Sequence, residues 1–365
     1  MKPLACCILL VSAACGRETT TPFVETTTSV RDVRTSLEGE GSVPGSITTF
    51  ERFTLGAIDG QFDWKSLGGV GARQPSSTHC AVYDHEIADV AAVVTGPYRL
   101  RDFERRSLRI SNAATSGCYS DQTFSARTAD VAGESEAWSR SGDGLVDYAL
   151  PGARLDNHFE AEWSFASAVP SAQQPGLEVV ASPARGDSHR MSWVQMADWP
   201  DGLAVVFAQR SNPAAAGAFV LTTVARRLDR RVPHTIKLSM DFVDGPSNDV
   251  VRVYVDGELR HQGTSWENYY HYDPHGQSAF GGATPAVNRL MFRTGSDLDR
   301  GIPGVAAPAT RGHGFLIDNM RLATFRVPGS DEGCENQGDC ERATSGAASG
   351  SNGQADDLKG GARRP

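Results

Sequence analysis

Basic charge, long apolar runs and helical periodicity are all scarce in this chain of 365 residues. Lysine and arginine total 35 against 44 aspartates and glutamates, which leaves a net charge of −9. Because phosphate binding needs a basic face, nucleic acid is excluded as an expected partner. Apolar residues rarely repeat with helical spacing, and the best helical candidate is the short segment 84–94. The sequence therefore argues against a helical or nucleic-acid-binding protein.

Motifs of several enzyme classes are also missing. The chain contains no GxSxG, HExxH or P-loop, and no GxGxxG between a strand and a helix. Their absence argues against the serine hydrolases, zinc proteases and nucleotide-binding enzymes that use them. No CxxC spacing supports a zinc site.

The first residues indicate export. Met1-Lys2 supplies a positive charge, and Leu4 to Ala14 is apolar but shorter than the roughly 20 residues that span a bilayer. Ser12-Ala13-Ala14-Cys15 resembles the bacterial lipobox, which implies cleavage and a lipid anchor on Cys15. The alternative is a plain secretion signal. Either way we expect an exported protein of the cell envelope or the extracellular space.

Export favours disulfides over free thiols. After loss of the signal peptide and lipidation of Cys15, four cysteines remain, and three pairings are possible. Cys334 and Cys340 enclose a short loop around Gly338, which favours their pairing and leaves Cys80 with Cys118.

Composition divides the chain into four parts. Residues 1–15 are the predicted signal peptide with its lipid cysteine, and 16–47 form a linker rich in threonine and serine. Residues 48–328 carry the predicted β-sandwich. Residues 329–365 form a low-complexity tail with a small cysteine loop, and both ends are expected to be disordered.

The clearest local signal is a β-hairpin. Val251, Val253 and Val255 alternate with polar neighbours, and Asp256-Gly257 suits a type I′ turn. Similar alternation elsewhere predicts a sandwich whose inward side chains include Trp163, Phe165, Leu238, Met240, Val253, Val255, Phe292 and Ile317. The opposite face of each strand is expected to be polar.

This order of strands over about 150–327, with the hairpin and a last strand at 314–322, resembles the concanavalin A-like (laminin-G-like) jelly roll. Residues 107–113 and 121–124 are similar to the first-strand region of secreted bacterial proteins of this shape. The resemblance implies an all-β, two-sheet antiparallel jelly-roll sandwich. It does not select a function, because the fold carries lectins, adhesive domains, glucanases and lyases.

A loop rich in aromatic and polar residues is predicted after the hairpin, and sugars need both: rings for their C–H faces and polar groups for their hydroxyls. The candidate ligand-binding residues are Trp266, Glu267, Asn268, Tyr269, Tyr270, Tyr272 and Asp273, with Trp199 at a second turn. The alternative is that these aromatics cap the edge of the sandwich and pack on its core.

Catalytic and metal candidates are weaker. Glu160 and Glu162 share one strand face about 7 Å apart, a spacing that glycoside hydrolysis permits, although the outward face of an ordinary strand is the favoured explanation. Tyr269, Tyr270 or His271 offers a base for a lyase. Asp318 on the last strand is a candidate ligand for a structural calcium, or else caps a loop. No other cofactor is expected.

These observations favour a surface-anchored carbohydrate-binding or adhesive domain without catalysis. Its expected partners are a polysaccharide or cell-surface glycan and, through the lipid, a membrane. Two alternatives stay open: a polysaccharide lyase or glycoside hydrolase on the same fold, and a structural envelope protein without a small ligand.

Overall fold

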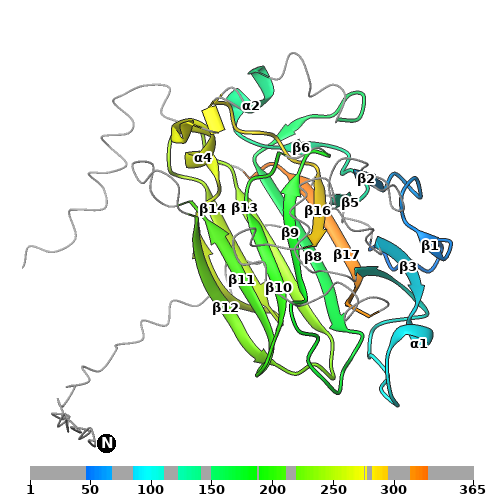
Figure 1. Ribbon diagram of the computed structural model, residues 1–365. Coiled ribbons are helices and arrows are strands. Elements are labelled where there is room, and N and C mark those ends of the chain that lie inside the picture. The colour runs from blue at the N-terminus through cyan, green and yellow to red at the C-terminus, as the bar shows by residue number, and fades with distance from the viewer. Residues whose placement is uncertain are drawn as a thin grey trace, which may run out of the picture. The chain divides into compact units, whose positions relative to one another are not determined.

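The protein is a sandwich of two β-sheets stacked face to face in the computed structural model (Figure 1). The structure describes residues 47–67, 85–110, 122–140, 149–186, 189–210, 219–274, 276–277, 282–294 and 313–327. All seven cysteines, the predicted signal peptide and tail, and the predicted linker except residue 47 lie outside these residues. Within the described part of the chain, no helix is long and apolar enough to cross a membrane.

The larger sheet has eight strands, and every pairing in it is antiparallel. In spatial order the strands are β1 (Gly56–Ala57), β3 (His85–Asp89), β4 (Arg106–Ile110), β17 (Phe315–Phe325), β8 (His158–Ser167), β13 (His234–Asp241), β14 (Val250–Val255) and β15 (Glu258–Gly263).

The second sheet has seven antiparallel strands. Their spatial order is β12 (Val220–Leu228), β11 (Gly202–Gln209), β10 (Trp193–Trp199), β9 (Glu178–Ala184), β16 (Arg289–Thr294), β5 (Gln122–Phe124) and β2 (Lys65–Leu67). A small parallel pair joins β6 (Val131–Ala132) to β7 (Leu155–Asp156), and the helices are α1 (Val90–Val93), α2 (Ser135–Arg140) and α4 (Glu267–Tyr272).

The core lies between the sheets, where the alternation of the strands places it. Along β8 and β13 the register pairs Ile236 with Trp163 and Leu238 with Ala161, so apolar residues of neighbouring strands share one face. All eight side chains predicted to point inward are 0% exposed. The predicted class, an all-β two-sheet antiparallel jelly-roll sandwich, is confirmed.

The predicted hairpin is confirmed as well. Asp256 and Gly257 have φ angles of 53° and 81°, which are the two positive values that a type I′ turn requires. Val255 pairs with Glu258 directly across the turn.

The outer faces of the two sheets differ. On the eight-stranded sheet the outward residues of β8, β13 and β14 are mostly polar, as predicted. The outer face of the seven-stranded sheet is mixed: buried polar side chains such as Gln195 and Arg293 lie on the same face as a small apolar cluster of Phe124, Ala184 and Met291, while β12 at the edge is largely exposed. The prediction of a polar outer face therefore holds only in part for this sheet. The unbroken apolar run from Leu203 to Phe207 is what a strand buried on both faces requires.

The helix predicted over 84–94 is also wrong. Residues His85 to Asp89 form strand β3, which pairs with β4 and buries Ile87, and only Val90–Val93 are helical. The side chain of Asp89 caps that turn by accepting a hydrogen bond from the amide of Ala91. Pairing with a distant strand outweighs local helical spacing here.

Two glycines at turns allow a matched test of the fold. Gly202 and Gly257 both have positive φ, but a Cβ at Gly202 would lie 2.7 Å from the Cα of Arg227, whereas a Cβ at Gly257 meets nothing within 4 Å. We expect Gly202→Ala to lower the free energy of unfolding by about 1–3 kcal/mol more than Gly257→Ala, because overpacking adds to the shared backbone strain. Urea unfolding of both variants measures the difference, and equal losses would contradict the tight packing of this turn.

Candidate functional site

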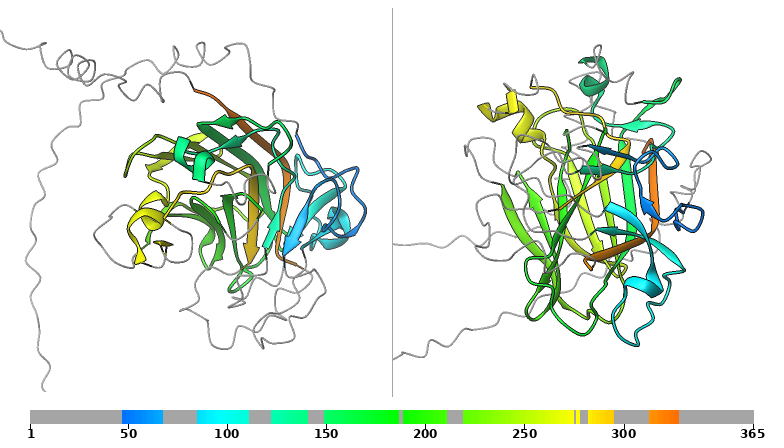
Figure 2. Two further views of the ribbon diagram at one scale, coloured as in Figure 1. Left: turned by 90° about the horizontal axis from the view of Figure 1, so that it is seen from above. Right: turned by 45° about the vertical axis from the view of Figure 1, so that its right-hand side comes forward.

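The aromatic cluster predicted as a loop folds as helix α4, at the end of the sandwich that also carries α2 (Figure 2). The amide of Glu267 donates to Ser265 Oγ at 3.0 Å, which helps the short helix to begin. The expectation of a loop is therefore wrong, because only six residues are helical and so short a helix leaves little periodicity in the sequence.

Burial separates the predicted sugar-binding residues into two groups. Trp266 is 4% exposed, Tyr270 is 2% exposed, and Glu267 and Asn268 are fully covered. Tyr272 is 42% exposed. The first group belongs to the interior of the protein, and Tyr272 faces solvent.

Trp266 packs on the end of the seven-stranded sheet. Its ring centroid lies 5.7 Å from that of Trp193 and 4.4 Å from that of Phe219, and the guanidinium of Arg190 lies over it at 5.4 Å. Its indole Nε1 donates to the carbonyl of Ala208 at 3.0 Å. These contacts favour the alternative interpretation for Trp266, in which it caps the sandwich edge.

Polar groups of the helix are bound to the fold in the same way. Asn268 Nδ2 donates to the carbonyl of Arg210 at 3.1 Å, and the Tyr270 hydroxyl donates to the carbonyl of Arg190 at 2.8 Å. Asp273 forms an ion pair with Arg210 at 2.7 Å. These hydrogen bonds anchor α4, so the amide and carboxylate are not arranged to hold sugar hydroxyls.

Trp199 is not brought to this cluster. It ends strand β10, whereas Trp193, which touches Trp266, begins it. Six residues of strand separate the two tryptophans by about 20 Å. The predicted ligand-binding residues therefore do not form one site.

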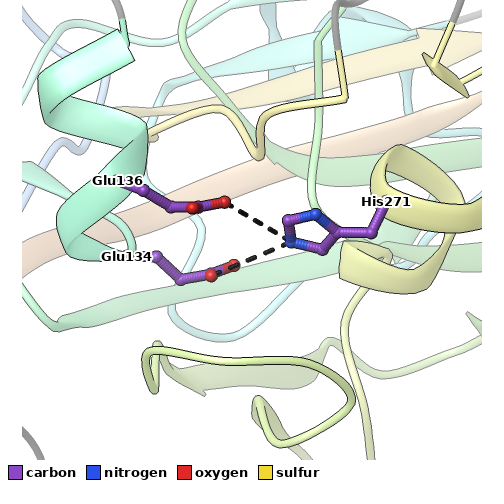
Figure 3. Close-up of side chains that lie close together, drawn as sticks. All are labelled: Glu134, Glu136 and His271. Atoms are coloured by element: carbon purple, nitrogen blue, oxygen red, sulfur yellow. Dashed lines mark ion pairs between the residues drawn. The ribbon is translucent and has the colours of Figure 1, made fainter.

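What remains open near the helix is a small group of side chains between α2 and α4. The ring centroids of Tyr272 and His271 are 6.0 Å apart, and His271 Nε2 lies 3.8 Å from the carboxylate of Glu136 in α2 (Figure 3). Tyr269 is partly buried against Trp266 and Phe219. An exposed ring thus lies beside an imidazole, which in turn approaches a carboxylate.

Beneath this group lie three buried carboxylates that the sequence analysis did not connect. Glu134, just before α2, Asp249, just before β14, and Glu267 of α4 each offer an oxygen within 4.8 Å of the others. Burial, together with the neighbouring carboxylates, raises the pKa of Asp249 and of Glu267 above their usual values. No motif in the sequence predicts this cluster, because Glu134 and Glu267 are more than a hundred residues apart in the chain.

Asp318 lies elsewhere. It is buried in β17, and its Oδ1 accepts a hydrogen bond from the amide of Asn319 at 2.8 Å. Burial raises its pKa to about 8. Among the described residues, neither group of three acidic or histidine side chains with metal-binding spacing includes it. Its role as a calcium ligand stays a prediction.

The Glu160–Glu162 pair belongs to an ion-paired surface of the eight-stranded sheet. Lys237 Nζ lies 2.6 Å from Glu160, and His158 Nε2 lies 3.6 Å from it. Burial alone would raise the pKa of Glu160, but the hydrogen bonds with His158 and Lys237 outweigh burial and lower the pKa below its usual value. A glycosidase acid needs a raised pKa, so Glu160 is poorly suited to donate a proton.

His158 occupies the centre of this surface. Its Nδ1 lies 2.5 Å from Asp241, which also pairs with Arg252 at 2.6 Å. Burial opposes the charged imidazolium, but the hydrogen bonds with Asp241 and Glu160 outweigh it and raise the pKa of His158. The folded state therefore favours the protonated ring.

This direction predicts a pH dependence of stability. The contribution of protonated His158 is fully present below its unfolded pKa of about 6.5 and is lost as the pH rises through the higher folded value. We expect the free energy of unfolding of the wild type to fall more than that of His158→Gln between about pH 6 and 9. Urea unfolding across this range measures the difference between the two proteins, which cancels groups common to both.

His261 provides the control. Burial lowers the pKa of His261, so its protonated ring destabilises the fold at low pH, and this penalty disappears as the pH rises toward about 6.5. His261→Gln therefore removes a pH dependence of stability opposite in direction to that of His158. If His158→Gln followed the wild-type pH profile, the charged pair with Asp241 would be refuted.

Comparison with known proteins finds distant likenesses of fold. No family model matches the chain, and a search of curated proteins finds no match. An endo-beta-1,4-glucuronan lyase from the fungus Trichoderma reesei is 12% identical, with a TM-score of 0.39 over 77% of this chain and 95% of that one. An alginate lyase from Pseudomonas aeruginosa is 10% identical, with a TM-score of 0.33 over 64% and 89%.

An endo-1,3-beta-glucanase from Streptomyces sioyaensis is also similar, at 10% identity and a TM-score of 0.32 over 57% of this chain and 71% of that one. Likenesses of this strength carry no argument about what this protein binds.

Proposed function

We propose that this protein is an exported, non-catalytic carbohydrate-binding sandwich, and that its glycan contacts lie between α2 and α4. The observation that carries this proposal is the exposed ring of Tyr272, 42% accessible, beside His271, whose Nε2 lies 3.8 Å from the carboxylate of Glu136. A sugar presents a flat C–H face and a rim of hydroxyls, which suits one open ring next to polar side chains. A site with a single exposed ring is expected to bind weakly.

Fewer residues are available to contact a glycan than the sequence predicted, because Trp266, Asn268 and Tyr270 are buried and Tyr272 is exposed. Trp266, Asn268 and Tyr270 support the site from below by fixing α4 on the sheet. Tyr269, half-buried against Trp266, adds its remaining exposed edge. The glycan therefore meets the helix at its C-terminal end, where Tyr272 lies.

Two of the candidate catalytic residues, Glu160 and Tyr270, are engaged in ways that argue against catalysis by them. Glu160 is ion-paired, with a lowered pKa, and the hydroxyl of Tyr270 is buried in hydrogen bonds with the backbone of Arg190. A lyase base has to reach its substrate, and a hydrolase acid has to hold a proton at working pH. Neither residue meets its requirement in this arrangement.

The glycan site is tested by truncating its ring. We expect Tyr272→Ala to weaken glycan binding at least about fivefold, the effect of losing roughly 1 kcal/mol of contact. A glycan array identifies a binding sugar, and titration calorimetry with that sugar compares the variants. Because Tyr272 is exposed, the variant should keep the unfolding midpoint of the wild type.

Tyr254→Ala is the matched control. Tyr254 is a partly buried tyrosine on the outer face of the eight-stranded sheet, under the ammonium of Lys237 at 5.7 Å. Its loss should leave glycan binding unchanged. Equal binding by Tyr272→Ala and wild type would refute the α4 site, and no binding to any glycan would favour the structural envelope alternative. Release of sugar products would support the lyase or hydrolase alternative.

Anchoring through Cys15 completes the proposal and rests on the sequence. Several acyl chains on the modified cysteine are needed for stable attachment, because one chain binds membranes only marginally. We expect Cys15→Ser to move the protein from the membrane fraction to the soluble fraction, whereas Cys7→Ser, inside the predicted signal peptide, should not. Fractionation followed by immunoblotting distinguishes them, and membrane attachment of Cys15→Ser would exclude the lipid.

A further inference from the structure

Three acidic side chains from distant parts of the chain converge under helix α4. Glu134 precedes α2, Asp249 precedes β14, and Glu267 is the first residue of α4. None is more than 3% exposed, and one oxygen of each lies within 4.8 Å of the others. The fold thus gathers three carboxylates where water is largely excluded.

Such a cluster is costly unless something compensates its charge. Buried carboxylates lose hydration and repel one another, and proteins normally pair them with basic groups or metal ions. Within the described ranges, no lysine or arginine forms an ion pair with any of the three. His271 lies nearby, with 3.9 Å between its Nε2 and the nearest carboxylate oxygen of Glu134.

Hydrogen bonds satisfy only part of the cluster. Asp249 accepts from Ser265 Oγ at 2.5 Å and from the amide of Val243 at 3.0 Å. Glu267 uses one oxygen to accept from the amide of Asp249. Glu134 Oε1 and Glu267 Oε1 are buried without any hydrogen-bond partner. Two fully buried acceptors in one cluster are what a bound cation would satisfy.

We infer that Glu134, Asp249 and Glu267 bind a divalent cation of the calcium type. The ligand atoms are all carboxylate oxygens, which hard cations prefer. Calcium–oxygen distances of about 2.3–2.6 Å place ligands on opposite sides of the ion up to roughly 5 Å apart, which spans the spacing of these oxygens. Magnesium, at about 2.0–2.1 Å, requires a tighter and more regular set.

Glu136 and His271 border the carboxylate cluster at Glu134. Both side chains are partly exposed, and both lie next to Glu134 between α2 and α4 (Figure 3). Ser135, between the two glutamates, is tied to Asp244 through its amide and its hydroxyl, at 2.7 and 2.5 Å. The ion would therefore join three elements that these hydrogen bonds already hold close.

The functional consequence is a rigid platform. An ion held by residues before α2, before β14 and in α4 fixes the helix that carries Tyr272. This inference stands apart from glycan binding, because the ion is detected without any sugar. It concerns a different place from Asp318.

The experiment measures calcium binding to protein stripped with EDTA and dialysed. Titration calorimetry should find calcium binding at one site, and calcium should raise the thermal unfolding midpoint because it binds only the folded state. Glu134→Gln and Glu267→Gln should each weaken binding at least tenfold. Magnesium, titrated in parallel, should bind more weakly than calcium.

The variants distinguish a lost ligand from a damaged fold. Each glutamine keeps the shape and removes one repelling charge, so the metal-free variants should unfold at or above the wild-type midpoint. Glu258→Gln makes the same change at an exposed ion pair with Arg260 and should bind calcium as the wild type does.

Two results would overturn the inference. No calcium binding by the wild type at about 10 mM, beyond the weakest range of protein sites, would show a carboxyl cluster that holds protons instead. Calcium binding that both glutamine variants retain would place the ion elsewhere. Neither result depends on whether a glycan binds to Tyr272.

Discussion

The stacking of the two sheets is centred on the packing of Trp163, from the eight-stranded sheet, against Phe292, from the seven-stranded sheet. Their rings meet edge to face, with centroids 6.2 Å apart, and Trp163 Nε1 points to the sulfur of Met196 at 3.4 Å. Both side chains are fully buried. Burial of large aromatic surface supplies much of the stabilisation of a sandwich, and the two sheets lie face to face because their inner side chains interdigitate.

That packing fixes the end of the sandwich where the candidate sites lie. Once the sheets are stacked, an apolar surface is left at the start of β10 and the end of β11. Trp266 covers this surface by packing on Trp193 and donating its indole N–H to the carbonyl of Ala208. Helix α4 is thus positioned by its buried residues rather than by helix propensity, which a six-residue helix cannot rely on. Its exposed end, with Tyr272, is a by-product of anchoring the rest.

Two polar clusters of the fold show opposite electrostatic solutions. On the outer face of the eight-stranded sheet, Glu160 and Asp241 meet His158, Lys237 and Arg252, and the charges compensate one another. Under α4, Glu134, Asp249 and Glu267 are buried together without a lysine or arginine partner among the described residues. On a surface whose charges are already paired, a bound ion would add little stabilisation. A buried cluster of negative charges would be stabilised strongly by a cation.

Local patterns in the sequence predict most of the strands, the hairpin at Asp256-Gly257 and the inward side chains from Trp163 to Ile317, because period-two alternation and positive-φ turn residues are local properties. Long-range packing was needed to establish which aromatics are covered, that 85–89 is a strand, and that β11 of the seven-stranded sheet is buried on both faces. A density of aromatic residues does not reveal whether a ring packs on the core or faces water: Trp266 and Tyr272 are six residues apart and differ in this. The same limit hid the carboxylate cluster, since its three members meet only when α2, β14 and α4 come together at one end of the sandwich.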